Sequence, residues 1–131
     1  MVIPMEQLTP LETVRAFIAA IERRDIKAAL VFVDEHCEYD NVPMGKNLGR
    51  ESIGKVLGPF LAGASEVDWV CHREAATGPI VCNERTDRFR FPHGWVEIPV
   101  TGVWEVHDGL ITLWRDYFDA AMFTSQMPGR S

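Results

Sequence analysis

The chain has 131 residues, of which 47% are hydrophobic and 24% are charged, and its formal net charge is −6. The length suits a single domain, which we expect over residues 1–131, and the composition is that of a globular protein rather than a disordered chain. The acidic charge disfavours binding to nucleic acid or to anionic membranes, and no apolar run is long enough for a membrane span.

The first half of the chain contains three predicted helices. Residues 9–12, Thr-Pro-Leu-Glu, are a typical helix start with a capping box, and apolar residues then recur at helical spacing. Asp25 predicts the cap of a second, short helix that ends at about Val33. A third helix is predicted over residues 49–61, with a kink or a break at Gly58-Pro59.

The rest of the chain shows the alternation of β-strands. A strand over residues 37–41 precedes the third helix, and Pro43 ends it. Four longer strands follow that helix, at about residues 67–75, 80–91, 95–106 and 110–118. Helices followed by a meander of strands predict an α+β fold, in which three to four helices pack on a curved mixed or antiparallel sheet.

The predicted strand over residues 80–91 has polar side chains in the middle of its apolar face. Val81 and Phe89 share this face with Asn83, Arg85 and Asp87, because side chains two residues apart point the same way. A buried charge is costly unless a partner of opposite charge compensates it. We therefore expect these polar residues to have partners on neighbouring strands.

The last two predicted strands extend this face. Asp116 lies among aromatic residues on the face formed by Leu110, Thr112, Trp114, Asp116 and Phe118. The preceding strand offers a nearly apolar wall of Ile98, Val100, Gly102 and Trp104. The glycine would let a bound molecule or another backbone approach closely. Trp114, beside Asp116, is the tryptophan that we expect to contact a ligand.

Two interpretations of the inward-facing Arg85, Asp87 and Asp116 are open at this point. They form a functional site, or they are a buried ion cluster that only sets strand register, unless a bulge displaces them. Two carboxylates around one cation can hold different protonation states, so one can act as a base and the other as an acid. Tyr39 and Asn41, on the inner face of the first strand, could orient a water molecule. The set suits acid–base chemistry on a neutral, apolar substrate.

Three segments of the chain resemble motifs of one known family. They are Tyr39-Asp40-Asn41-Val42-Pro43, Glu84-Arg85-Thr86-Asp87 and Trp114-Arg115-Asp116-Tyr117-Phe118-Asp119. Their order and approximate spacing resemble those of the limonene-1,2-epoxide hydrolase family. The resemblance implies a ketosteroid isomerase-like architecture with a deep, cone-shaped pocket, usually in a homodimer, and no cofactor.

The same resemblance implies a role for each polar residue. Asp116 would be the base that activates water together with Tyr39 and Asn41. Asp87 would be the acid that protonates the epoxide oxygen, and Arg85 would bridge the two carboxylates. The residues that fall where the family lines its pocket are Phe89, Ile98, Val100 and Phe118. The implied reaction is one-step addition of water to an apolar, cyclic epoxide, which yields a vicinal diol.

Other functions compete with this one. An isomerase or polyketide cyclase of the same architecture, or a non-catalytic small-molecule binding module, would also place such residues in an apolar cup. Metal binding is not expected, because the ligand-type residues lack paired metal-ligand spacing: His36, Cys37, Cys71, His72 and Cys82. The cysteines suggest no disulfide framework and residues 1–7 lack the features of a secretory signal, so we expect a cytoplasmic protein.

Overall fold

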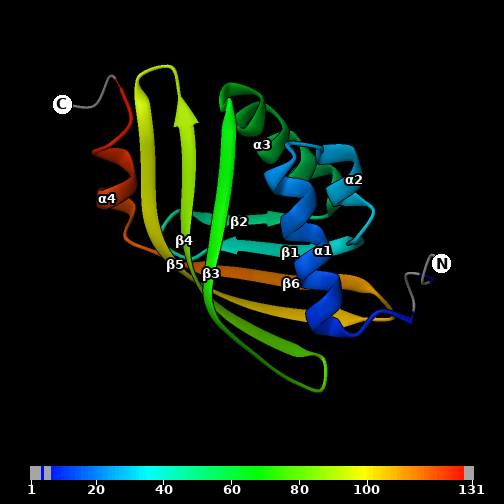
Figure 1. The fold of residues 1–131 in the computed structure, drawn as a ribbon. Helices are drawn as coiled ribbons and strands as arrows, with labels where there is room; N and C mark the ends of the chain where they lie inside the picture. Colours follow the sequence, from blue (N-terminus) through cyan, green and yellow to red (C-terminus); the bar gives the residue numbers. More distant parts are fainter. Residues whose placement is uncertain (1–3, 5–6, 129–131) are drawn as a thin grey trace.

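The computed structural model describes residue 4 and residues 7–128, which form four helices and six strands (Figure 1). The helices are α1 (Pro10–Glu22), α2 (Ile26–Leu30), α3 (Arg50–Gly63) and α4 (Ala120–Thr124). The strands are β1 (Val33–Asn41), β2 (Gly45–Leu48), β3 (Glu66–Thr77), β4 (Ile80–Phe91), β5 (Gly94–His107) and β6 (Leu110–Tyr117). No helix in these described residues is long and apolar enough to cross a membrane.

All six strands belong to one curved sheet, in the order β2-β1-β6-β5-β4-β3. The pairing of β1 with β6 is parallel and every other pairing is antiparallel, so the sheet is mixed. Figure 1 shows the long strands bending strongly, with α1, α2 and α3 gathered together and α4 apart from them, next to β5. The predicted α+β architecture is therefore confirmed.

Side-chain caps fix the N-terminal ends of the first two helices. The Thr9 hydroxyl accepts a hydrogen bond from the Glu12 backbone N–H at 3.1 Å, and the Glu12 carboxylate accepts one from the Thr9 N–H at 2.9 Å. The Asp25 carboxylate caps α2 in the same way, accepting from the Ala28 N–H at 3.0 Å. The helix α2 ends at Leu30, earlier than predicted, because β1 already begins at Val33.

Helix α3 is continuous and carries Pro59 in its interior, so the predicted break at Gly58-Pro59 does not occur. Proline removes one hydrogen bond, the one to the carbonyl group four residues earlier. That carbonyl belongs to Lys55, which is exposed and can be hydrated instead. The helix therefore loses little at this point and presents one apolar side to the sheet.

A bulge in β6 changes which of its residues face inward. Ile111 pairs with Val106 but Leu113 pairs with Glu105, which leaves Thr112 as an extra residue. The Thr112 hydroxyl donates a hydrogen bond to the Glu105 carbonyl oxygen at 3.2 Å. Ile111 is consequently fully buried, and the prediction that Leu110 and Thr112 lie on the inner face is wrong. The residues after the bulge keep the predicted alternation.

The strand β2 was not expected from the sequence, and β1 is longer than its predicted residues 37–41. Residues 45–48 are short and half polar, so their own pattern carries no strand signal. They are ordered by antiparallel pairing with β1, in which Tyr39 faces Asn47 and Asn41 faces Gly45. This pairing covers the outer edge of β1.

The core lies between the inner face of the sheet and the helices. Phe17 of α1 packs edge-on against Trp104 and Trp114, with ring centroids 5.7 and 5.1 Å apart, and the two indoles stack on each other at 5.0 Å. The aromatic cluster anchors α1 to β5 and β6. Beside it, the sheet and α3 leave a cavity.

Candidate active site

The cavity lies between the inner face of the sheet and helices α3 and α4, and has a volume of about 190 Å³. Four of its lining residues bring hydroxyl, amide or carboxyl groups: Tyr39, Asn41, Asp87 and Asp116. The others are apolar or aromatic: Met44, Val56, Leu57, Phe60, Leu61, Trp69, Phe89, Ile98, Val100, Phe118 and Phe123. A mostly apolar cup with a few convergent polar groups is the usual form of a small-molecule site.

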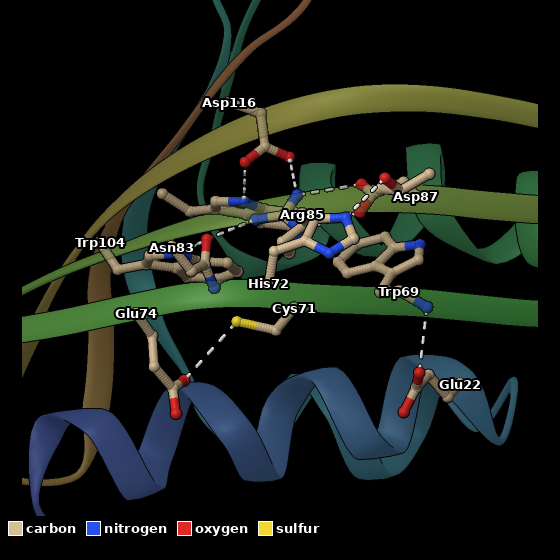
Figure 2. A network of polar contacts seen from close by, with 12 residues as sticks. Glu22, Trp69, Cys71, His72, Glu74, Asn83, Arg85, Asp87, Trp104 and Asp116 are labelled. Carbon is tan, nitrogen blue, oxygen red and sulfur yellow. Dashed lines mark hydrogen bonds and ion pairs between the residues drawn. The ribbon is translucent and has the colours of Figure 1, made fainter.

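The polar part of the cavity is organised by Arg85, whose side chain is completely buried. Its Nε and Nη2 donate to the two carboxylate oxygens of Asp87 at 2.9 and 3.0 Å (Figure 2). The same Nη2 donates to Asp116 Oδ2 at 3.0 Å. Strand alternation thus places the three charged side chains together, and no bulge displaces them.

Further contacts hold the guanidinium group from the other side. Arg85 Nη1 donates to Asn83 Oδ1 at 2.8 Å, and Trp104 Nε1 donates to the same oxygen at 3.1 Å. The guanidinium carbon also lies 4.9 Å from the centre of the Trp69 ring, a cation–π arrangement. Burial opposes the charge of Arg85, but Asp116 and Asp87 more than offset it, so the pKa of Arg85 lies above its ordinary value.

The Asp116 carboxylate is held at both oxygens. Trp114 Nε1 donates to Oδ1 at 2.9 Å, and Arg85 occupies Oδ2. The Trp114 indole is 1% exposed and lies between Tyr39, at 3.8 Å between ring centroids, and Trp104. Trp114 is therefore not a wall of the cavity, and our prediction that it contacts a ligand is corrected: it supports Asp116 and Tyr39 from beneath.

Parallel pairing brings β1 into the site. Tyr39 is opposite Trp114 and Asn41 is opposite Asp116 in the β1–β6 register, so both β1 side chains reach the cavity beside Asp116. Burial and the neighbouring Asp116 raise the pKa of Tyr39, although a hydrogen bond with Asn41 acts in the opposite direction. Tyr39 is thus a neutral phenol that can donate or accept a hydrogen bond.

Asp87 is poised to hold a proton. Burial raises its pKa to about 6, the charge of Arg85 and its hydrogen bonds act against the rise, and the nearby Asp116 adds to it. The two hydrogen bonds from Arg85 use only part of the accepting capacity of a carboxyl group, which has about four lone-pair positions. A proton on Asp87 is therefore compatible with its contacts to Arg85.

The apolar walls agree in part with the prediction. Phe89, Ile98, Val100 and Phe118 all line the cavity. The sequence did not reveal that α3 supplies a whole wall, although its apolar stripe was visible: Val56, Leu57, Phe60 and Leu61. Trp69 from β3 and Phe123 from α4 were also missed as lining residues, since neither strand order nor the course of α4 can be read from residue patterns.

Metal-ligand residues do not gather in the part of the chain that the structure describes. Among residue 4 and residues 7–128, no group of three or more His, Cys, Asp or Glu side chains could hold a metal ion. Cys37 is buried, whereas Cys71 and Cys82 are exposed, and all three are free thiols.

The fold and the cavity define a class of protein: a curved α+β cup with a buried arginine between two carboxylates. A comparison with known proteins identifies this class, because the family model of the limonene-1,2-epoxide hydrolase catalytic domain matches residues 8–128. The chain therefore belongs to this family.

Individual relatives support the assignment. Epoxide hydrolase EphG of Mycobacterium tuberculosis is 35% identical over 106 residues, which are 81% of this chain and 70% of that protein. A solved structure of a limonene-epoxide-hydrolase-like enzyme from M. tuberculosis has 32% identity and a TM-score of 0.79, covering 88% of this chain and 86% of that chain. A protein with a ketosteroid isomerase-like fold from Catenulispora acidiphila has a TM-score of 0.78 at 20% identity over 91% and 93% of the two chains, which shows the fold alone.

Gly102 offers a direct test of how tightly the polar network is packed. We expected this glycine to admit a bound molecule or another backbone, but side chains approach it instead. A Cβ atom at this position would lie 2.5 Å from Arg85 Nη1, 2.7 Å from Asn83 Oδ1 and 2.9 Å from Trp104 Nε1. We predict that Gly102→Ala lowers the free energy of unfolding by about 1–3 kcal/mol through overpacking, measured by urea denaturation followed by circular dichroism.

Gly58→Ala is the matched control. A Cβ atom there would meet nothing within 4 Å, and the residue lies inside α3. Alanine should stabilise the helix by about 0.5–1 kcal/mol relative to glycine. Equal urea midpoints for Gly102→Ala and the unmodified protein would contradict the close packing around Arg85.

Proposed function

We propose that this protein is an epoxide hydrolase that adds water to an apolar, cyclic epoxide and releases a vicinal diol without a cofactor. The family match and the epoxide hydrolases among its relatives support this activity. The observation that carries the proposal is Arg85 bound by both Asp87 and Asp116 beside an apolar cavity. Such a site offers an acid and a base to an uncharged substrate.

In this proposal Asp116 is the general base. Its position beside Tyr39 and Asn41 supports the binding of a water molecule among the three side chains. Trp114 and Arg85 fix the two carboxylate oxygens, so the base keeps its orientation while it takes a proton from the water. Holding the water in place removes part of the entropic barrier to its attack on a ring carbon.

Asp87 is the general acid in the same step. An epoxide opens poorly because its leaving group is an alkoxide until a proton arrives, and the raised pKa of Asp87 keeps a proton available. As the water oxygen bonds to carbon, the ring C–O bond breaks and the Asp87 proton passes to the epoxide oxygen. The water proton passes to Asp116, so the total charge around Arg85 does not change.

The fold by itself does not select this reaction. Isomerases, cyclases and binding proteins of the same architecture are the competing functions, and they require neither a bound water nor an acid next to a ring oxygen. Two carboxylates on one arginine, together with the Tyr39–Asn41 pair, favour hydrolysis. Exchange of solvent deuterium into a ketone without any epoxide turnover would support an isomerase instead.

Substitution of the two aspartates tests the assigned roles. The unmodified protein should convert members of a panel of cyclic epoxides into diols without added metal or nucleotide. We predict that Asp87→Asn and Asp116→Asn each lower kcat by about 10²–10⁴-fold, since each removes one proton-transfer group. Asp108→Asn, in the turn between β5 and β6, is the matched control and should leave kcat unchanged.

Heavy-oxygen water distinguishes direct attack by water from attack by a carboxylate. In a single turnover in such water, the diol should carry the label in its first-formed product. An unlabelled first product would mean that an aspartate oxygen entered the diol through a covalent ester, and would overturn the one-step mechanism. Failure of the whole panel to react would overturn the proposed function.

The raised pKa of Asp87 predicts the pH dependence of the reaction. Asp87 must be protonated to act. On the basic side of the pH profile, kcat/KM should therefore be highest below about pH 6 and fall as the pH rises through that value. The fall should approach tenfold per pH unit, because one proton is lost. A kcat/KM that stays constant from pH 5 to pH 8 would show that Asp87 is not the acid.

A homodimer is also part of the proposal, and it rests on the resemblance to the family. The outer face of β4, opposite the cavity, carries the side chains of Cys82 and Thr86 and is compatible with a subunit contact. Sedimentation velocity at micromolar concentration should give about twice the mass of one chain. A single species with the mass of one chain would contradict the dimer.

A cytoplasmic location and a single domain over residues 1–131 stay predictions from the sequence.

A further inference from the structure

We infer that Trp69 is a specificity-determining residue whose indole N–H binds an uncharged oxygen acceptor on the substrate. The cavity would then favour epoxides that carry a second oxygen, in a carbonyl, hydroxyl or ether group, over hydrocarbon epoxides of the same shape. The inference rests on the proposed function and names a substrate class for it.

The first observation is an unsatisfied donor. Trp69 is 6% exposed and lines the cavity, yet its Nε1 is buried and has no hydrogen-bond partner among the described residues. The two other buried tryptophans each have one: Trp104 donates to Asn83 and Trp114 donates to Asp116. Leaving a buried donor unpaired costs free energy, and a ligand in the cavity that Trp69 lines would supply the acceptor.

The second observation is that the Trp69 side chain is held in place. Its backbone N–H, on the free edge of β3, donates to Glu22 Oε2 of α1 at 3.0 Å (Figure 2). The indole covers the Arg85 guanidinium and meets the Phe89 ring edge-on at 6.2 Å between centroids. Contacts on several sides prevent the indole from turning to a partner within the protein. The donor is therefore preorganised, which lowers the entropic cost of binding an acceptor.

The third observation concerns direction. Figure 2 shows the indole nitrogen of Trp69 at the end of the ring system that is farther from Arg85. Trp69 lies opposite Asp87 in the β3–β4 register, but its indole N–H makes no hydrogen bond to the Asp87 carboxyl group. An oxygen bound at Trp69 is therefore a second substrate oxygen, distinct from the epoxide oxygen that Asp87 would protonate.

The surroundings restrict the acceptor to an uncharged group. The walls next to Trp69 are apolar, and the charged groups that line the cavity are the carboxyl groups of Asp87 and Asp116. An anionic substrate group would be repelled by them and would lose its hydration without a cation in reach, because Arg85 is already taken up by its own partners. A neutral carbonyl, hydroxyl or ether oxygen avoids both costs.

The test compares two cyclic epoxides of the same shape, one with a ketone and one with a methylene group in its place. The measured quantity is the ratio of their kcat/KM values, ketone over methylene. Trp69→Phe keeps an aromatic ring but removes the N–H, and should lower this ratio about tenfold, as expected for the loss of one buried hydrogen bond. General damage to the fold changes both substrates alike and cancels in the ratio.

Trp95→Phe is the matched control, because Trp95 is 39% exposed, stacks on Arg88 and does not line the cavity. This variant should leave the ratio unchanged. A ratio that shifts less than twofold in Trp69→Phe, or shifts equally in Trp95→Phe, would overturn the inference.

Binding separates this inference from the proposed activity. Calorimetry with the ketone and methylene compounds that lack the epoxide ring should give the same tenfold change in the ratio of Kd values for Trp69→Phe. If no epoxide reacts but this ratio changes, the proposed activity fails and the Trp69 donor stands. If epoxides react and neither ratio changes, the donor fails and the activity stands.

A measurement on the unmodified protein covers the case in which Trp69→Phe does not fold. Nitrogen-15 spectra resolve tryptophan indole N–H signals, and the ketone compound should move one of them while the methylene compound does not. Assignment of that signal to Trp95, or identical shifts with both compounds, would overturn the inference.

Discussion

Charge balance around one buried guanidinium is the constraint on which the site depends. Arg85 is out of contact with water and faces two carboxyl groups, Asp87 and Asp116, which are themselves nearly buried. If both were ionised, the group of three would carry a net negative charge in a poorly solvated place, which is costly. Burial and the nearby Asp116 accordingly raise the pKa of Asp87 to about 6, although Arg85 acts against the rise. The arrangement of one cation between two carboxyl groups therefore supports the acid role that we propose for Asp87.

The two carboxyl groups differ in their neighbours. Asp116 accepts a hydrogen bond from Trp114 in addition to that from Arg85. Asp87 has only Arg85 as a side-chain donor and is raised by burial to a pKa of about 6. The stacked ring of Trp114 therefore supports the proposed base although it lies outside the cavity, because its N–H holds one oxygen of Asp116.

The sequence predicted the parts of the site that depend on strand alternation. Long strands with regular pairing, such as β4 and β5, keep a period of two, so the inward direction of Asn83, Arg85 and Asp87 could be read directly. The bulge at Thr112 broke the same rule in β6, because an extra residue leaves no mark in the order of polar and apolar residues. The strand β2 was missed for another reason: it forms because it pairs with β1, and its own residues carry no strand pattern. The role of Trp114 could not be predicted either, since inward direction does not tell whether a side chain reaches the cavity or lies beneath another ring.

The polar and the apolar residues of the cavity come from different parts of the fold. The charged group and the neighbouring Tyr39 and Asn41 come from β1, β4 and β6, whose register fixes them relative to one another. Most of the apolar surface comes from α3, from β5 and from the segment around α4, which contribute no charge. Side chains of these walls can therefore change shape without disturbing the charge balance at Arg85. Trp69 belongs to both parts, because its ring covers the guanidinium while its N–H remains unpaired within the described residues. Under our inference it would link the identity of the substrate to the charged group.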